Sequence, residues 1–216
     1  MKRAVSVKEL KAMQFDGYPF KGPFYELVGS PSKGCVWLIW GESGNGKTSF
    51  LMQLSNYLAE YGKVMYNSLE EGIGQTLRLA TIRNGLTGEN SYPVQLQQES
   101  MTDLTVRLRK RRSANFVIID SFQFAKLNAL SFAFFCDEFK ARGKNILFIS
   151  HADGNKPMGR SANSARYYAD IKIRIEGFKA FPISRFGGSQ KPYVIWPEGA
   201  GEYWGVGEKS TKKTEL

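Results

Sequence analysis

The sequence predicts an α/β domain with a mostly parallel central sheet flanked by helices. Short β-rich runs alternate with helical stretches along the chain, which is the pattern of strands joined by crossover helices. The runs at residues 116–119 and 146–149 are wholly apolar, as expected for strands buried on both faces of a sheet. With 216 residues, the chain is long enough for one domain with a substantial core.

The individual elements follow from periodicity and from stop signals. The first predicted helix, residues 48–61, carries one apolar stripe and stops at Gly62. Strands are predicted at residues 36–40, 64–68, 94–96, 116–119 and 146–149, and further helices at residues 73–86, 103–112 and 129–142. The alternation of strand and helix over this stretch is what favours a parallel sheet.

The pattern changes after the strand at residues 146–149. Residues 153–169 are rich in Gly, Asn and Ser and are basic, which predicts a loop. Strands predicted at residues 171–175, 181–185 and 193–196 are expected to be antiparallel and to lie at one edge of the sheet. We therefore expect a core at residues 34–207. An N-terminal arm, residues 1–33, precedes it and packs on the core or on a neighbour, and a basic, disordered tail, residues 208–216, follows.

Charge and cysteine usage narrow the class of protein. Lys and Arg number 30 and Asp and Glu number 20, and the net charge of +10 fits a polyanionic partner such as nucleic acid and a merely soluble basic surface equally well. Cys35 and Cys136 cannot form a disulfide framework, and with one His they cannot supply a zinc site. Because neither a signal peptide nor a membrane-spanning run is apparent, we expect a cytoplasmic protein.

A phosphate-binding loop is the strongest motif in the chain. Residues 41–48 read GESGNGKT, between a predicted strand and a predicted amphipathic helix. The glycines let backbone N–H groups point inward at phosphate oxygens, and the helix N-terminus adds partial positive charge. Lys47 is expected to reach the β- and γ-phosphates of ATP, and the Thr48 hydroxyl to hold Mg²⁺. The predicted nucleotide-binding residues are Gly41, Glu42, Ser43, Gly44, Asn45, Gly46, Lys47, Thr48 and Ser49.

Acidic residues follow two further predicted strands. Asp120 comes directly after the apolar run 116–119, where it is expected to help hold Mg²⁺ near the phosphate-binding loop. Glu70 and Glu71 follow the strand at residues 64–68, which opens into the same crevice if the sheet is parallel. Either carboxylate could accept a proton from the attacking water, and we favour Glu70. The alternative is that both are solvated acids at a helix start.

The order of these motifs resembles the RecA superfamily core, which includes RecA and RadA recombinases, replicative DnaB-type helicases and small phage recombination ATPases. The resemblance covers roughly residues 34–188 and runs through the phosphate-binding loop, Ser-Leu-Glu at 68–70, Val-Ile-Ile-Asp-Ser at 117–121 and Phe-Ile-Ser-His at 148–151. The Ser-Leu-Glu stretch is most similar to DnaB, in which this Glu is the catalytic base. The single-core layout, without a DnaB-type N-terminal or a RecA-type C-terminal domain, is more similar to phage single-strand-annealing ATPases.

The resemblance implies two further catalytic residues. His151 falls where the family has a polar sensor of the γ-phosphate, which leads into a DNA-binding loop. The alternative for His151 is a surface or core residue with no such role. Arg185 falls where DnaB carries a Lys-x-Arg finger that enters the ATP site of the adjacent subunit, although Ile183 replaces the Lys and Lys179 is at the wrong spacing. These assignments imply a homo-oligomer, ring or filament, with ATP at the subunit interfaces. The alternative for Arg185 is a surface residue at a hairpin bend.

The resemblance also places DNA at two loops. Cations track a phosphate backbone while aromatic rings stack on bases. Of the adjacent Tyr167 and Tyr168, only one is expected to face the DNA. The cluster at residues 107–112 is interpreted as a solvated face, and a mobile crossover loop is the alternative for residues 153–169. The predicted DNA-binding residues are Lys156, Arg160, Arg166 and Tyr167 in this segment, and Lys126 in the loop at residues 122–128.

The combined prediction is an ATP-hydrolysing RecA-like protein that binds single-stranded DNA in recombination or annealing, encoded by a phage or prophage. A single-strand-binding protein is a further candidate partner. Two alternatives stay open: a DnaB-like helicase or replication motor, and a nucleotide-switched scaffold or signalling ATPase. The basic segment at residues 153–169 argues against the scaffold.

Overall fold

A single β-sheet organises the fold, and its parallel strands carry the candidate site at their carboxyl ends. The structure is a computed structural model that describes residues 3–86 and 92–205. Strands β3, β2, β4, β5, β1 and β7 lie side by side and are parallel, and β8 and β9 continue the sheet as antiparallel edge strands. β6 forms a hairpin with β5. The bounds are β1 Val36–Gly41, β2 Val64–Ser68, β3 Val94–Gln97, β4 Phe116–Asp120, β5 Asn145–Asp153, β6 Lys156–Pro157, β7 Ile171–Glu176, β8 Lys179–Ser184 and β9 Tyr193–Val194.

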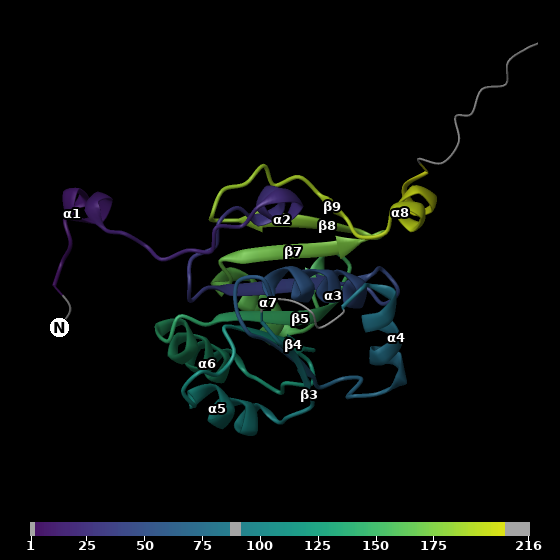
Figure 1. Cartoon of the computed structure of the whole chain (residues 1–216), viewed down its shortest axis with the longest axis horizontal. Helices are drawn as coiled ribbons and strands as arrows, with labels where there is room; N and C mark the ends of the chain where they lie inside the picture. Colours follow the sequence, from purple (N-terminus) through teal and green to yellow (C-terminus); the bar gives the residue numbers. More distant parts are fainter. Residues whose placement is uncertain (1–2, 87–91, 206–216) are drawn as a thin grey trace, which may run out of the picture.

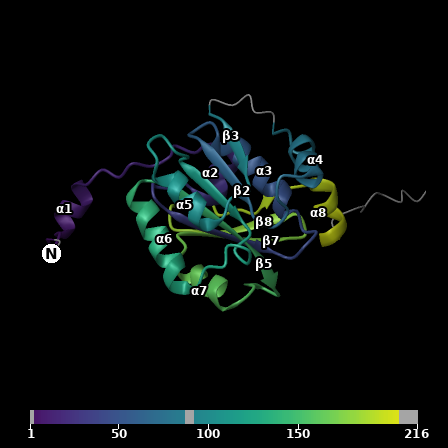
Figure 2. The same cartoon turned by 90° about the horizontal axis from the view of Figure 1, so that it is seen from below.

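Helices cover both faces of this sheet and bury a core on each. One core joins the sheet to α2 and α3, and the other joins it to α5, α6 and α7. Figure 2 shows α6 and α7 together on one side of the sheet. The bounds are α1 Val7–Ala12, α2 Gly22–Val28, α3 Lys47–Leu58, α4 Gln75–Arg83, α5 Met101–Arg109, α6 Ala129–Ala141, α7 Arg160–Tyr168 and α8 Pro197–Trp204. The predicted α/β class, with a mostly parallel sheet and antiparallel edge strands, is confirmed.

Parallel register brings the predicted site residues to one edge of the sheet. Gly41 at the end of β1 lies opposite His151 of β5, and Ser68 at the end of β2 lies opposite Asp120 of β4. The backbone N–H of Glu70 donates to the carbonyl oxygen of Asp120 at 3.1 Å, which ties the ends of β2 and β4 together. The phosphate-binding loop, both carboxylate segments and the sensor position therefore share one crevice.

The prediction of a loop at residues 153–169 is wrong. This segment forms the β6 hairpin strand and then the helix α7, which begins after Gly159. Ala162 and Ala165 are buried against the sheet, where their small side chains let the helix approach closely. Gly, Asn and Ser are poor helix formers, so the composition predicted a loop, but tertiary packing of the alanine face outweighs that preference.

The chain after β8 also departs from the prediction. The strand expected at residues 193–196 is limited to Tyr193–Val194, and Trp196 is instead the residue before α8. Pro197 stands in the first turn of that helix, where its missing N–H costs nothing. The helix was not predicted from the sequence because two glycines interrupt its hydrophobic periodicity. Gly199 is required because a Cβ there would lie 2.2 Å from the Trp196 ring.

The N-terminal segment divides into an embedded part and a projecting part. From Tyr18 onward it packs into the core, where the Phe24 ring of α2 stacks on Tyr57 and Tyr193 at centroid distances of 4.5 and 5.0 Å. By contrast, α1 has no buried residue and stands away from the body of the molecule (Figure 1). The predicted tail at residues 208–216 lies outside the described residues. None of the helices within the described ranges has the length and apolarity needed to cross a membrane.

Candidate nucleotide site

The phosphate-binding loop has the backbone geometry that the motif predicts. It follows Gly41, the last residue of β1, and ends where α3 begins at Lys47. Gly46 has φ 92°, a left-handed conformation that favours glycine, and it turns the chain directly into the helix. The free N–H groups of the first helical turn therefore face the crevice together with the positive end of the helix dipole. This arrangement is suited to an anion such as a phosphate.

Lys47 is held on the loop itself. Its Nζ donates to the carbonyl oxygens of Gly41 and Glu42, both at 2.8 Å. Burial lowers the pKa of Lys47, and the carboxylates of Asp120, Glu70 and Glu42 oppose that shift. A partly desolvated ammonium that is hydrogen-bonded only to neutral carbonyls is stabilised when an anion binds beside it. Lys47 is therefore positioned to transfer its hydrogen bonds to a phosphate.

One cavity collects most of the predicted catalytic residues. It has a volume of about 300 Å³ and opens between the phosphate-binding loop and the ends of β2, β4 and β5. Its walls include Arg83 and Phe178, which the sequence did not indicate. Both come from elsewhere in the fold, at the end of α4 and at the turn between β7 and β8, so no local motif marks them. The predicted residues on its walls are Ser43, Gly44, Gly46, Lys47, Thr48, Ser49, Glu70, Glu71, Asp120 and His151.

Asp120 and Thr48 supply oxygen donors that fit a magnesium ion. The Tyr66 hydroxyl donates a hydrogen bond to the Asp120 carboxylate. Burial raises the pKa of Asp120 to about 6. The hydrogen bond from Tyr66 opposes the shift, and Glu70 and Glu71 add to it. A cation would relieve this crowding of negative charge. The described residues contain no cluster of three His, Cys, Asp or Glu that could hold a metal ion.

Glu70 and His151 meet across the cavity. The Nε2 atom of His151 lies 3.0 Å from Oε2 of Glu70, and both side chains are about one-third exposed, at 28% and 31%. The proposed base and the proposed sensor thus form one hydrogen-bonded pair, which is accessible to water. Glu71 lines the same cavity.

Gln123 connects His151 to the segment that follows it. Its Oε1 accepts from the backbone N–H of His151 at 3.3 Å, and its Nε2 donates to Ser150 Oγ at 2.9 Å and to the Met158 carbonyl oxygen at 3.0 Å. The Met158 N–H donates back to the His151 carbonyl oxygen at 2.9 Å. Sequence reasoning missed Gln123, although its place three residues after Asp120 was a usable signal.

A larger cavity of about 630 Å³ adjoins the first on the side of α4. The two cavities share Ser49, Arg83 and Phe178. Trp196 is 46% exposed and, with Ile195, supplies an apolar wall, while Gln53 and Asn84 supply amides that are hydrogen-bonded to each other at 3.3 Å. A flat apolar wall beside hydrogen-bonding amides is suited to a planar heterocycle.

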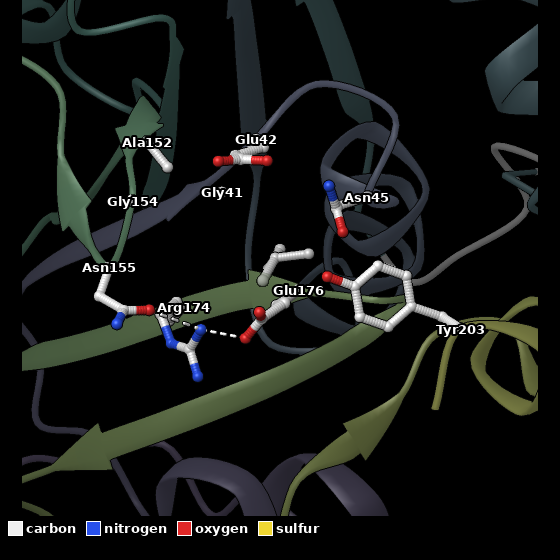
Figure 3. A pocket seen from close by; sticks show the side chains of 10 residues that line it. Gly41, Glu42, Asn45, Ala152, Gly154, Asn155, Arg174, Glu176 and Tyr203 are labelled. Atoms are coloured by element: carbon white, nitrogen blue, oxygen red, sulfur yellow. Dashed lines mark hydrogen bonds and ion pairs between the residues drawn. The ribbon is translucent and has the colours of Figure 1, made fainter. Parts of the chain in front are cut away.

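A different cavity, on the other side of the phosphate-binding loop, is less suited to phosphate. It measures about 210 Å³ and is lined by Asn45, Arg174, Glu176 and Tyr203, among others. Figure 3 shows the Arg174 side chain directed at Asn155 and Glu176, to which it is bonded. Because its arginine is already paired with a carboxylate, this cavity does not offer an anion the cation that Lys47 provides in the first.

Arg185 lies near the amino ends of the parallel strands, whereas its own phosphate-binding loop lies at their carboxyl ends. Its guanidinium donates to Asp170 Oδ1 at 3.2 Å, and Oδ2 of Asp170 accepts from the Val36 N–H at the start of β1 at 3.0 Å. Within one subunit this position does not bring Arg185 to the cavity of Lys47. A role in catalysis therefore requires a second copy of the chain, as the sequence prediction states.

The cations predicted to bind DNA do not lie in the nucleotide cavity. Lys156 on β6, Arg160 at the start of α7, and Lys126 are all exposed. Arg166 is different because its guanidinium stacks 5.6 Å from the centroid of the Trp40 ring. Three of the four predicted cations are thus free to meet an external polyanion, and Arg166 also has a structural contact.

The two adjacent tyrosines differ as expected. Tyr167 is 77% exposed. Tyr168 packs edge-on against Phe132 with ring centroids 5.4 Å apart, and its hydroxyl donates to Asp137. The helical geometry of α7 sets neighbouring side chains about 100° apart, which explains why Tyr167 is exposed whereas Tyr168 is partly buried.

Comparison with known proteins supports the same superfamily. No family model matches the chain. A stretch of 99 residues is 34% identical to the DNA repair protein RadA of Aquifex aeolicus (strain VF5), and this match covers 45% of the chain and 21% of that relative. The chain therefore spans only about a fifth of the length of the RadA relative that it matches.

The fold is similar to that of the flagellar accessory protein FlaH from Methanocaldococcus jannaschii. The TM-score is 0.58 at 16% sequence identity, and the match covers 83% of this chain and 93% of FlaH. This likeness shows a RecA-like α/β fold. Together, the two comparisons support a place in the RecA/RadA superfamily, without indicating a phage annealing subtype.

Proposed function

We propose that this chain is a Mg²⁺-dependent ATPase that binds single-stranded DNA under the control of its nucleotide and acts in recombination or annealing. The observation that carries the proposal is the cavity in which Lys47, Thr48 and Asp120 face the Glu70–His151 pair. It combines a phosphate cradle, oxygen donors for a cation and a carboxylate that can orient water. We further propose that its specific task is single-strand annealing for a phage or prophage.

Each residue of the cavity has a distinct task in this proposal. The loop N–H groups and Lys47 bind the β- and γ-phosphates, and Thr48 and Asp120 hold Mg²⁺, which neutralises phosphate charge when bound. Glu70 orients a water and accepts its proton. His151, hydrogen-bonded to Glu70, changes partner when the γ-phosphate is present or absent.

The adjoining cavity is proposed to hold the base of the nucleotide against Trp196. Replacing Trp196 by Ala removes the flat apolar wall, so ATP binding should weaken by about tenfold, a loss of about 1.4 kcal/mol. Trp196→Phe, which keeps a ring, is the matched control and should retain most of the affinity. Titration calorimetry with ATP measures both. An unchanged dissociation constant in Trp196→Ala would place the base elsewhere.

Nucleotide control of DNA binding follows from the contacts of Gln123. The path from Glu70 runs through His151 and Gln123 to Met158, which directly precedes Gly159 and helix α7. A change of partner at His151 can therefore shift α7, which carries Arg160, Arg166 and Tyr167. The name of the RadA relative, a DNA repair protein, supports DNA as the partner. Arg185 is proposed to complete the ATP site of an adjacent copy in a homo-oligomer.

Single-stranded DNA should bind more tightly with a non-hydrolysable ATP analogue than with ADP, and it should raise the ATPase rate. Replacing Lys156, Arg160 and Arg166 together by Ala should flatten the log–log salt dependence by up to about two units, at about 0.7 for each phosphate that is no longer neutralised. Fluorescence anisotropy with a labelled oligothymidylate at several salt concentrations measures this.

Replacing the exposed Lys8, Lys11 and Lys191 by Ala removes the same charge elsewhere and serves as the control. If the two triple variants have equal log–log salt slopes, the nucleotide-controlled DNA contact does not lie on α7. If DNA does not change the ATPase rate of the wild-type protein, the scaffold alternative is favoured.

A further inference from the structure

Basic residues that the proposed function does not use lie at the amino ends of the parallel strands, opposite the phosphate-binding loop. These strand ends are called an edge of the sheet below. Lys63 directly precedes β2, and its Nζ donates to the Arg112 carbonyl oxygen at 3.3 Å. Asn115, directly before β4, bonds the Lys63 backbone in both directions. These contacts bring Lys63 beside the exposed run Lys110, Arg111 and Arg112. Because β4 has five residues that each rise about 3.3 Å, this edge lies about 16 Å from Asp120.

Within the described residues, nearby cations are paired with carboxylates, whereas these are not. Arg107 pairs with Glu99, and Arg109 pairs with Glu138 at 2.7 Å. The side chains of Lys110, Arg111 and Arg112 form no salt bridge with any acidic residue in the ranges 3–86 and 92–205. The prediction that the whole cluster at residues 107–112 is one solvated face therefore needs refinement, because its two halves differ in charge compensation.

A buried lysine reinforces the positive potential of this edge. Lys144 lies directly before β5 and is 8% exposed, and its Nζ donates to Ser113 Oγ and the Ala114 carbonyl oxygen at 2.8 and 2.7 Å. These acceptors carry no net charge, so they do not neutralise the ammonium, although burial and the nearby Arg142 lower the pKa of Lys144.

An exposed aromatic residue, Tyr92, precedes the strand next to β2 and so lies at the same ends of the strands as Lys63. Tyr92 is 41% exposed, and the chain passes from it through Pro93, whose carbonyl oxygen accepts from the N–H of Val64, the residue after Lys63. Cations that track phosphates beside a ring that can stack on a base are the two elements of single-strand recognition.

We propose that Lys63, Lys110, Arg111, Arg112 and Tyr92 form a second binding surface for single-stranded nucleic acid, here called the basic edge. The cations contact the phosphate backbone, and Tyr92 stacks on a base. The basic edge lies at the opposite ends of the strands from the ATP cavity and, within the described residues, none of its five side chains is hydrogen-bonded to His151 or Gln123. Its binding is therefore independent of nucleotide, which separates it from the DNA contact proposed for α7.

The test is a triple variant, Lys110→Gln, Arg111→Gln and Arg112→Asn, measured without nucleotide. Asn is chosen at position 112 because Arg112 has φ 62°, a conformation that Asn tolerates. Binding of labelled oligothymidylate should weaken, and the log–log salt slope should flatten by about two units if each of the three cations neutralises a phosphate. Lys8→Gln, Lys11→Gln and Lys191→Gln form the charge-matched control and should keep the wild-type slope.

Tyr92 allows a second, charge-neutral test. Tyr92→Ala should weaken oligothymidylate binding by about tenfold with an unchanged salt slope, whereas Tyr92→Phe should bind like the wild type because it keeps the ring. ATP turnover without DNA should be normal in all these variants, which shows that they fold.

The two proposals fail in different ways. If the Lys110–Arg112 triple variant loses no more nucleotide-free affinity than its control, the basic edge is refuted whatever the ATPase rate does. The same conclusion follows if this variant loses binding only to vesicles of phosphatidylcholine and phosphatidylserine and keeps its oligothymidylate affinity. A DNA-insensitive ATPase rate, with slope changes confined to the Lys110–Arg112 variant, would refute the control of DNA binding by nucleotide and leave the basic edge standing.

Discussion

Replacing Lys47 by Ala is expected to reduce ATP turnover by about 10²-fold to 10³-fold or more. The variant loses the ammonium that now rests on the carbonyl oxygens of Gly41 and Glu42, and no other cation within the described residues lies on the loop side of the cavity. The loop glycines and helix α3 stay unchanged, so the fold should persist. Steady-state phosphate release measures the effect.

Lys191→Ala, at an exposed position, is the control for Lys47→Ala and should turn over ATP like the wild type. Thermal unfolding of both variants verifies that the fold is intact. Wild-type turnover in Lys47→Ala would refute the assignment of the phosphate-binding loop.

Glu70→Gln is expected to bind ATP with nearly normal affinity and to hydrolyse it about 10²-fold to 10⁴-fold more slowly. Gln has the shape of Glu and can still hydrogen-bond His151, so the phosphate cradle and the Glu70–His151 contact are preserved while the basic oxygen is removed. Titration calorimetry for binding and single-turnover hydrolysis separate the two effects.

Glu71→Gln is the matched control because Glu71 lines the same cavity. It should keep most of the activity. If Glu71→Gln is the inactive variant and Glu70→Gln is active, the base lies one residue further along. If both variants hydrolyse ATP normally, another group activates the water.

The chain sequence by itself determined the composition of the candidate nucleotide site. Each of its motifs comes directly after a predicted strand, namely GESGNGKT, the acid after residues 116–119 and the two acids after residues 64–68. Parallel strands bring their carboxyl ends together on one side of the sheet, so these motifs meet there. That rule needs only the order and type of the elements. This is why the cavity contains Lys47, Asp120, Glu70 and His151 as expected.

Local sequence could not determine contacts between segments far apart in the chain. Arg83 and Phe178 line the cavity from α4 and from the turn after β7, and neither belongs to a motif. The same holds for the Tyr66 hydroxyl, whose bond to Asp120 depends on the register of β2 against β4. Such contacts arise from the packing of whole elements, on which hydrophobic periodicity carries no information.

Tertiary structure also decided whether a segment is helical where the local helix preference is weak. Helix α7 forms from a Gly-, Asn- and Ser-rich segment because Ala162 and Ala165 are buried against the sheet. Helix α8 forms where Pro197 starts a turn and Gly199 fits under Trp196. The strands and the long amphipathic helices were predictable because their burial pattern repeats along the chain, whereas these short helices gain their stability from neighbours that the local sequence does not reveal.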